Sequence, residues 1–136
     1  MKERVPKQTK PFTLEELNAW WESESTLALL PKGCIPEKTC KKAHFAITQR
    51  APREFYNGIC EALIQYGKID RRACFIYRDR IIMRNPIEIK KIISTLKPLV
   101  RLLKRKAQIE AFERFYKARE HLFRPYIPKP ALKRQQ

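Results

Sequence analysis

Glycine is scarce in this chain of 136 residues and occurs only at Gly33, Gly58 and Gly67. Three isolated glycines cannot build the glycine-rich loops that cradle nucleotide phosphates. The chain also has only two histidines and two aspartates, which leaves little material for acid–base or metal chemistry. The sequence therefore predicts a protein that is not an enzyme and that uses no cofactor.

Long apolar runs are missing as well. None approaches the roughly 18 residues that a membrane span needs, and the opening residues MKERVPKQTKPF lack the apolar core of a secretion signal. We therefore expect an intracellular protein of the cytoplasm or nucleus that does not contact a membrane. Four cysteines are scattered through the chain, and in such a compartment free thiols are expected at Cys34, Cys40, Cys60 and Cys74.

Negative charge is in short supply. The chain has 30 lysines and arginines against 14 acidic residues, for a formal net charge of +16. Self-repulsion of this size weakens the compact state unless a polyanion neutralises it. Solubility alone is one explanation of the charge, but the usual partner of such a basic domain is nucleic acid. Since 43% of the residues are hydrophobic, we expect a folded domain and not a disordered polycation.

The N-terminal half predicts three helices. Thr13 and Glu16 form a capping box, which predicts a helix from residue 13 to about residue 30, before Pro31. A second helix is expected over residues 36–50, with the apolar side chains inward and the lysines outward. The third helix begins at Pro52 and ends near Gly67, a residue suited to a left-handed stop.

The C-terminal half predicts two more helices. Asn85 and Pro86 together signal the start of one of them. Pro98 interrupts it, and apolar residues at steps of three and four predict a long helix over residues 99–123. Arginine and lysine occupy the opposite side of the first half of this helix.

Between these halves, residues 71–84 read RRACFIYRDRIIMR and predict a β-hairpin. A two-residue turn at 78–79 would pair Tyr77 with Arg80 and Phe75 with Ile82, and would bury an entirely apolar face. A three-residue turn at 78–80 would flip the faces and make Tyr77 a core residue. Arg-Asp is a poor two-residue turn, but we favour the first register because it buries no charge. Its buried side chains would be Cys74, Ile76, Ile81 and Met83.

These elements define the expected fold class: α+β and mainly helical, with four to five helices, one β-hairpin and a long C-terminal helix. We expect a disordered basic arm at residues 1–11, a single domain at 12–123 and a proline-rich basic tail at 124–136. The order helix, helix, helix, hairpin resembles a winged-helix arrangement, in which the third helix enters the major groove and the hairpin forms the wing. The predicted third helix, however, is apolar along two neighbouring stripes and is better suited to the core.

We interpret the chain as a nucleic-acid-binding protein that neutralises phosphates with basic clusters and stacks bases on aromatic side chains. A plain structural hairpin with solvated arginines remains the alternative for residues 71–84. Neither DNA nor RNA is favoured, because no base-reading pattern is visible. The predicted contact residues are Lys38, Lys41, Lys42, Arg53, Phe75, Tyr77, Arg80, Arg84, Lys90, Lys91, Lys97, Arg101, Lys104 and Arg105.

Two other functions remain open. The protein could be a structural subunit of a ribonucleoprotein or nucleoprotein assembly, or an adaptor whose basic surface grips an acidic protein. In either case the acidic helix at residues 13–30 could dock a protein partner through Trp20 and Trp21. The same helix could instead cover part of the basic surface.

Two kinds of metal site have candidate ligands in the sequence, and neither site is expected. Cys40 and His44 lie four residues apart, and Cys34 is nearby, but the closely paired ligands of structural zinc sites are missing. A fourth ligand would have to come from Cys60 or Cys74. A magnesium-dependent nuclease could use Asp70, Asp79 and Glu61, although loop aspartates usually serve turns.

Overall fold

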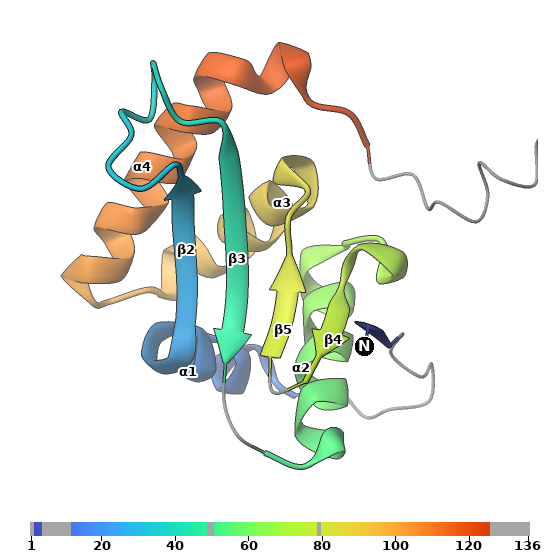
Figure 1. The fold of residues 1–136 in the computed structure, drawn as a ribbon. Coiled ribbons are helices and arrows are strands. Elements are labelled where there is room, and N and C mark those ends of the chain that lie inside the picture. The colour runs from blue at the N-terminus through green and yellow to red at the C-terminus, as the bar shows by residue number, and fades with distance from the viewer. Residues whose placement is uncertain (1, 4–11, 49–50, 79, 126–136) are drawn as a thin grey trace, which may run out of the picture.

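The computed structural model describes residues 2–3, 12–48, 51–78 and 80–125 (Figure 1). The helices in this part of the chain are α1 (Leu14–Glu24), α2 (Arg53–Gly67), α3 (Pro86–Leu96) and α4 (Leu103–Arg119). Three short 3-10 turns accompany them: η1 (Arg71–Ala73), η2 (Lys97–Leu99) and η3 (Glu120–Leu122). The strands are β1 (Lys2–Glu3), β2 (Ser25–Leu30), β3 (Lys42–Thr48), β4 (Phe75–Tyr77) and β5 (Arg80–Met83).

The strands form one antiparallel sheet in the order β1-β4-β5-β3-β2. After β1, the chain consists of two consecutive α-β-β units followed by α3 and α4. Each unit contributes a hairpin, and the hairpins meet where β3 pairs with β5. Figure 1 shows the four helices behind the sheet. The α+β, mainly helical class is confirmed, but the sheet is larger than the single predicted hairpin.

The core lies between the sheet and the helices. Strand residues at alternate positions point toward the helices, which is the period expected of a half-buried strand. Together with side chains from all four helices they form a single apolar cluster. Its largest fully buried members are Trp21, Phe45, Phe112 and Phe115.

The first helix is shorter than predicted. The capping box is present: the Glu16 amide donates to Thr13 Oγ1 at 3.2 Å, and Glu16 Oε1 accepts from the Thr13 amide at 2.8 Å. The helix ends at Glu24, however, and the next six residues form β2. These residues read STLALL, a run without a helical stripe whose first residues alternate between buried and exposed. The prediction of helix to residue 30 was therefore wrong.

The helix predicted over residues 36–50 was also wrong. Residues 31–41 form a loop in which a disulfide joins Cys34 to Cys40. Residues 42–48 then form β3, with Phe45 and Ile47 buried and Lys42 exposed. The same disulfide overturns the prediction of four free thiols, although Cys60 and Cys74 are free. Strand β2 replaces the end of the predicted first helix and β3 replaces the second, which removes the helix, helix, helix, hairpin order on which the winged-helix resemblance depended.

The third helix was predicted well, apart from its end. It begins after Pro52 and includes Gly67, but Lys68 is the residue in the left-handed conformation, at φ 59°. Gly67 is required for a different reason. A Cβ atom at that position would collide with the Ile92 side chain of α3. The glycine therefore allows α2 and α3 to approach closely.

The favoured hairpin register is confirmed. Tyr77 pairs with Arg80 and Phe75 pairs with Ile82, while the predicted buried face is buried, at Cys74, Ile76, Ile81 and Met83. Arg78 adopts the left-handed conformation at φ 56°, which is uncommon for a residue other than glycine. Asp79 lies outside the described residues.

The last two helices follow the predicted order with later boundaries. Asn85 Oδ1 accepts hydrogen bonds from the amides of Ile87 and Glu88 and begins α3 as predicted. Helix α4 begins only at Leu103, because Pro98 lies within η2 and an extended stretch follows that turn. In the part of the chain that the structure describes, no helix has the length and apolar character of a membrane span. The predicted arm is described only at β1, and the predicted tail only at residues 124–125.

Candidate functional site

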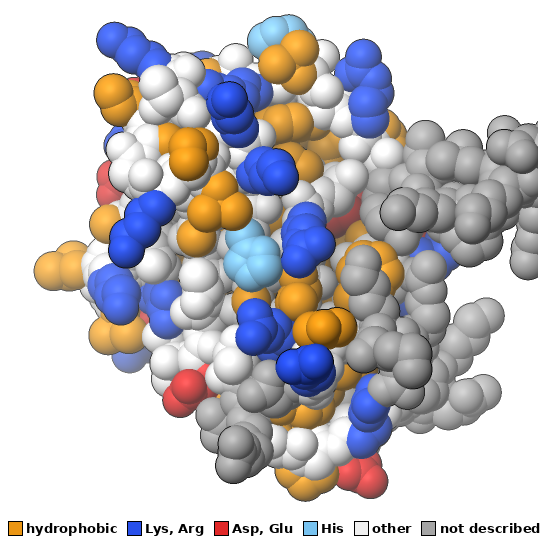
Figure 2. All heavy atoms as spheres, in the orientation of Figure 1, with side chains coloured by type: hydrophobic (Ala, Val, Ile, Leu, Met, Phe, Trp, Pro, Cys, Tyr) orange, Lys and Arg blue, Asp and Glu red, His pale blue; other side chains and the backbone are white. Residues whose placement is uncertain are grey.

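One side of the sheet faces away from the helices and carries the candidate site. We call it the sheet face. It is rich in basic, aromatic and small side chains, and its members follow from the strand register and the burial pattern: Thr26, Ala28, Leu30, Lys42, His44, Ala46, Thr48, Phe75, Tyr77, Arg80, Ile82 and Arg84. None of these side chains is acidic. Figure 2 shows this side of the molecule, with basic side chains spread across it and few carboxylates.

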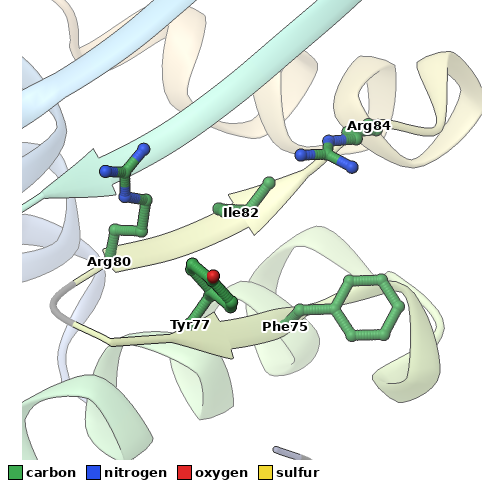
Figure 3. A pocket seen from close by; sticks show the side chains of 5 residues that line it. All are labelled: Phe75, Tyr77, Arg80, Ile82 and Arg84. Atoms are coloured by element: carbon green, nitrogen blue, oxygen red, sulfur yellow. The ribbon is translucent and has the colours of Figure 1, made fainter. Parts of the chain in front are cut away.

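A shallow hollow of about 280 Å³ lies on the sheet face, lined by Phe75, Tyr77, Arg80, Ile82 and Arg84. In Figure 3 the side chains of Arg80, on β5, and Arg84, directly after β5, rise on the same side, with Ile82 between them. The two aromatic rings come from the neighbouring strand β4. The hollow thus combines two exposed guanidinium groups with partly exposed aromatic surface. This arrangement explains why a β-hairpin keeps its arginines: they occupy the side that the core does not use.

His44 lies on the central strand β3 beside these arginines. It precedes Phe45, which pairs with Met83, so it is adjacent to Arg84, the residue that follows β5. Burial lowers the pKa of His44, and the positive charges of Arg84 and Arg80 lower it further. The imidazole is therefore neutral in the free protein at neutral pH. A phosphate placed among these groups would favour its protonated form.

A second, larger hollow adjoins the first. We call it the basic groove; it has a volume of about 550 Å³ and is lined by Leu30, Lys41, Lys42, Ala43, His44, Arg84, Pro86 and Phe123. Arg84 lines both hollows. The sequence did not predict Leu30, His44 or Phe123 as site residues. The segment KAHFAIT alternates with a period of two, and this strand pattern is the signal that places His44 on the outward side.

Several predicted contact residues do not belong to either hollow. Lys91 forms an ion pair with Glu88 at 3.0 Å, and Lys97 pairs with Glu113 at 3.0 Å. Lys90 lies 3.8 Å from the same Glu113 carboxylate. These three lysines are therefore matched by local carboxylates. The remaining predicted residues outside the hollows are exposed and dispersed over a loop and two helix starts: Lys38, Arg53, Arg101 and Lys104.

Arg105 was predicted to contact phosphate, and the structure contradicts this. Its side chain is only 6% exposed. Arg105 Nε donates to the Glu22 carbonyl oxygen at 3.0 Å, and Nη1 donates to Gln108 Oε1 at 2.8 Å. Because α4 packs against the end of α1, this charge lies inside the protein.

The acidic helix is also used internally. One Glu22 carboxylate oxygen accepts hydrogen bonds from the amides of Arg101 and Leu102, both at 2.9 Å. Burial acts to raise the pKa of Glu22, but these hydrogen bonds and those of Asn18 outweigh it and lower the pKa. Trp21 is fully buried and cannot dock a partner as predicted.

The residues weighed for metal binding have other roles. Cys34 and Cys40 are bonded to each other. Glu61 forms an ion pair with Arg71, and Asp70 Oδ1 accepts from the Arg72 amide at 2.8 Å at the start of η1. Among the residues that the structure describes, no cluster of three or more histidine, cysteine, aspartate or glutamate side chains could hold a metal ion.

Comparison with known proteins adds no family to this picture. No protein-family model matches the chain, and no curated protein or solved structure shows significant similarity to it. Any function must therefore be argued from the sheet face itself.

Proposed function

We propose that the protein binds nucleic acid through the sheet face. The observation that supports this most directly is the composition of that face. In a chain of net charge +16, it presents two exposed arginines beside two aromatic rings, and none of its described side chains is acidic. Guanidinium groups bind phosphate oxygens in a bidentate manner, and aromatic rings stack on bases.

The backbone supports the same proposal. Antiparallel strands hold outward side chains in a regular array, so the spacing of the cations is set by the sheet and not by flexible loops. The major groove of duplex DNA admits a two-stranded β-ribbon, and single strands can also lie across a sheet and stack on its aromatic residues. The proposal covers both forms of nucleic acid. It does not include a winged-helix mode of groove reading, nor a catalytic step.

The proposal is tested with labelled oligonucleotides. Fluorescence anisotropy would measure affinity for single-stranded DNA, duplex DNA and structured RNA over a range of salt concentrations. The test variant is Arg80→Gln with Arg84→Gln, which removes two charges from the sheet face. The control is Lys106→Gln with Lys117→Gln, which removes two charges from exposed positions on α4.

If the sheet face binds phosphates, the arginine variant should have a shallower slope of log affinity against log salt concentration. The slope should fall in magnitude by about 1.8 for duplex DNA or about 1.4 for a single strand, the values for two lost phosphate contacts. The control should change it much less. Equal effects in the two variants would mean that only total charge matters, and the proposal would be wrong. Competition by polyglutamate as effectively as by DNA would favour an acidic protein partner instead.

A further inference from the structure

We propose that the basic groove continues the interface beyond the sheet face and holds the sugar–phosphate backbone of the same nucleic-acid molecule. This inference rests on the proposed function and assigns a second contact region to it. The interface would then run along β3 and β5 from the β4–β5 turn toward the loop that follows β2.

The first support is the charge of the groove. Lys41, Lys42 and Arg84 line it, and no carboxylate does among the residues that the structure describes. Elsewhere in the described chain, lysines such as Lys91 and Lys97 are paired with glutamates. A hollow that gathers three cations without a carboxylate in its lining is suited to an anion, and a phosphodiester carries one negative charge per nucleotide.

The second support is the shape and chemistry of the walls. Leu30, Pro86 and Phe123 supply apolar surface beside the cations. The Phe123 ring lies 5.6 Å from that of Phe115 and 5.3 Å from that of Tyr116, so it is held in an aromatic cluster. A sugar or base can pack on such a wall while its phosphate contacts the cations. A small inorganic anion would leave this wall unused.

The third support is continuity. Arg84 contributes to both hollows, and His44 lies beside it on β3. From Thr48 to Lys42, β3 advances about 20 Å at about 3.3 Å per residue. This corresponds to about six steps of 3.4 Å along duplex DNA. A ligand on the sheet face that extends along β3 therefore reaches the groove.

The groove is also preformed. The Lys41 amide donates to the Leu30 carbonyl oxygen at 2.6 Å, which closes the loop between β2 and β3. Cys40, directly before Lys41, is fully buried and joined to Cys34. The backbone that carries the two lysines is thus fixed before any ligand binds, which limits the entropy lost on binding.

Charge removal tests the groove. Lys41→Gln with Lys42→Gln should reduce the slope of log affinity against log salt concentration, measured with a duplex of about 12 base pairs, by about 1.8 in magnitude. Both lysines are exposed, so the variant should melt at the parent temperature. The Lys106→Gln, Lys117→Gln protein is again the matched control. If Arg80→Gln with Arg84→Gln weakens binding but the Lys41, Lys42 variant behaves like the control, the groove inference is wrong and the proposed function stands. If neither variant differs from the control, both are wrong.

Photocrosslinking gives an independent readout. Phe123→p-benzoylphenylalanine should crosslink to the oligonucleotide on irradiation. The control is Leu103→p-benzoylphenylalanine, at a position 80% exposed on α4, which should not. Equal or absent crosslinking at both positions, in folded proteins that still bind, would overturn the inference.

A free nucleotide is the other source of the same phosphate chemistry. Adenosine monophosphate should neither compete with the duplex nor raise the melting temperature at micromolar concentration. If it does both through Lys41 and Lys42, the groove is a mononucleotide site and the inference is wrong.

Discussion

The guanidinium carbon of Arg105 lies 5.1 Å from the centre of the Trp21 ring. A cation over an indole face is attracted by the negative electrostatic potential that the ring quadrupole creates above that face. Together with the hydrogen bonds to Glu22 and Gln108, this contact ties α4 to the end of α1. Arg105 is therefore part of the interior, unlike the arginines of the sheet face.

Replacing Arg105 should change stability and not nucleic-acid affinity. We expect Arg105→Gln to lower the free energy of unfolding by about 2–3 kcal/mol, because hydrogen bonds from a charged, buried donor are lost. Urea unfolding would measure the change. The folded variant should bind nucleic acid with the same salt dependence as the parent. A salt slope smaller by the value of one phosphate contact would contradict the assignment of Arg105 to the interior.

Tyr77 should show the opposite behaviour. On the observed register its ring is only partly buried and lines the sheet-face hollow. We expect Tyr77→Ala to weaken nucleic-acid binding by about 1–3 kcal/mol if a base stacks there, with little change in the melting temperature. Anisotropy titrations and thermal melts of the same sample would measure both. A stable variant that binds as tightly as the parent would mean that the hairpin has only a structural role.

Ile81 provides the matched core position on the same hairpin. Its side chain is fully buried on the opposite side of β5. Replacing it by alanine removes buried methyl groups and leaves a cavity, which should cost about 2–5 kcal/mol of stability. Urea unfolding would measure the loss. A loss well below 1 kcal/mol would place Ile81 outside the core.

His44 should make binding depend on pH. Its pKa is lowered by burial and by Arg84 and Arg80, and Lys42 is a further cation on the same strand. A bound phosphate would raise this pKa, so protons would be taken up on binding and affinity should increase as the pH falls from the pKa of the bound state to the lower pKa of the free state. Each pKa unit gained corresponds to about tenfold in affinity. Titrations between pH 5.5 and 8 on the parent and on His44→Gln would measure this, and parallel profiles would contradict it.

The same shift has a consequence for the free protein. The imidazole of His44 has a lower pKa in the folded protein than in the unfolded chain, where the pKa is 6.5. The stability that neutral His44 contributes is therefore fully present above pH 6.5. It is lost as the pH falls from that value through the folded pKa. His44→Gln should remove this part of the pH dependence of unfolding.

The disulfide between Cys34 and Cys40 should stabilise the fold modestly. It closes a short loop, with a sequence separation of 6, and loop-closure entropy predicts about 2 kcal/mol. Cys34→Ala with Cys40→Ala should lower the urea midpoint accordingly. Reductant should lower the parent midpoint and leave that of the variant unchanged. Equal midpoints for all samples would show that the bond does not contribute.

The elements that were predicted correctly have strong local signals. Asn85 and Pro86 begin α3, and the capping box at Thr13 begins α1. The hairpin register followed from a simple requirement, that no charge be buried on the side of Ile76 and Ile81. Each of these signals lies within a few residues of the structure that it predicts.

The elements that were missed depend on distant partners. In KKAHFAIT, apolar residues fit both a spacing of four and a spacing of two, and pairing with β2 and β5 selects the strand. The buried position of Arg105 depends on Trp21 and Glu22, which lie some eighty residues earlier. Spacing alone likewise could not show that Cys34 pairs with Cys40. The sheet face was predicted in part because its hairpin is local, whereas the groove joins four separate segments.

The antiparallel pairing of β3 with β5 makes the sheet face a joint product of the two α-β-β units. Cut at the connection between β3 and α2, the chain would yield two fragments, each with an unpaired strand edge where the other should lie. Each fragment would contain some of the cationic side chains of the sheet face, but neither fragment alone would fix the distances between the two sets. Reassociation of the fragments would be required to restore these distances, so a polyanion that recognises them would act as a template for fragment complementation.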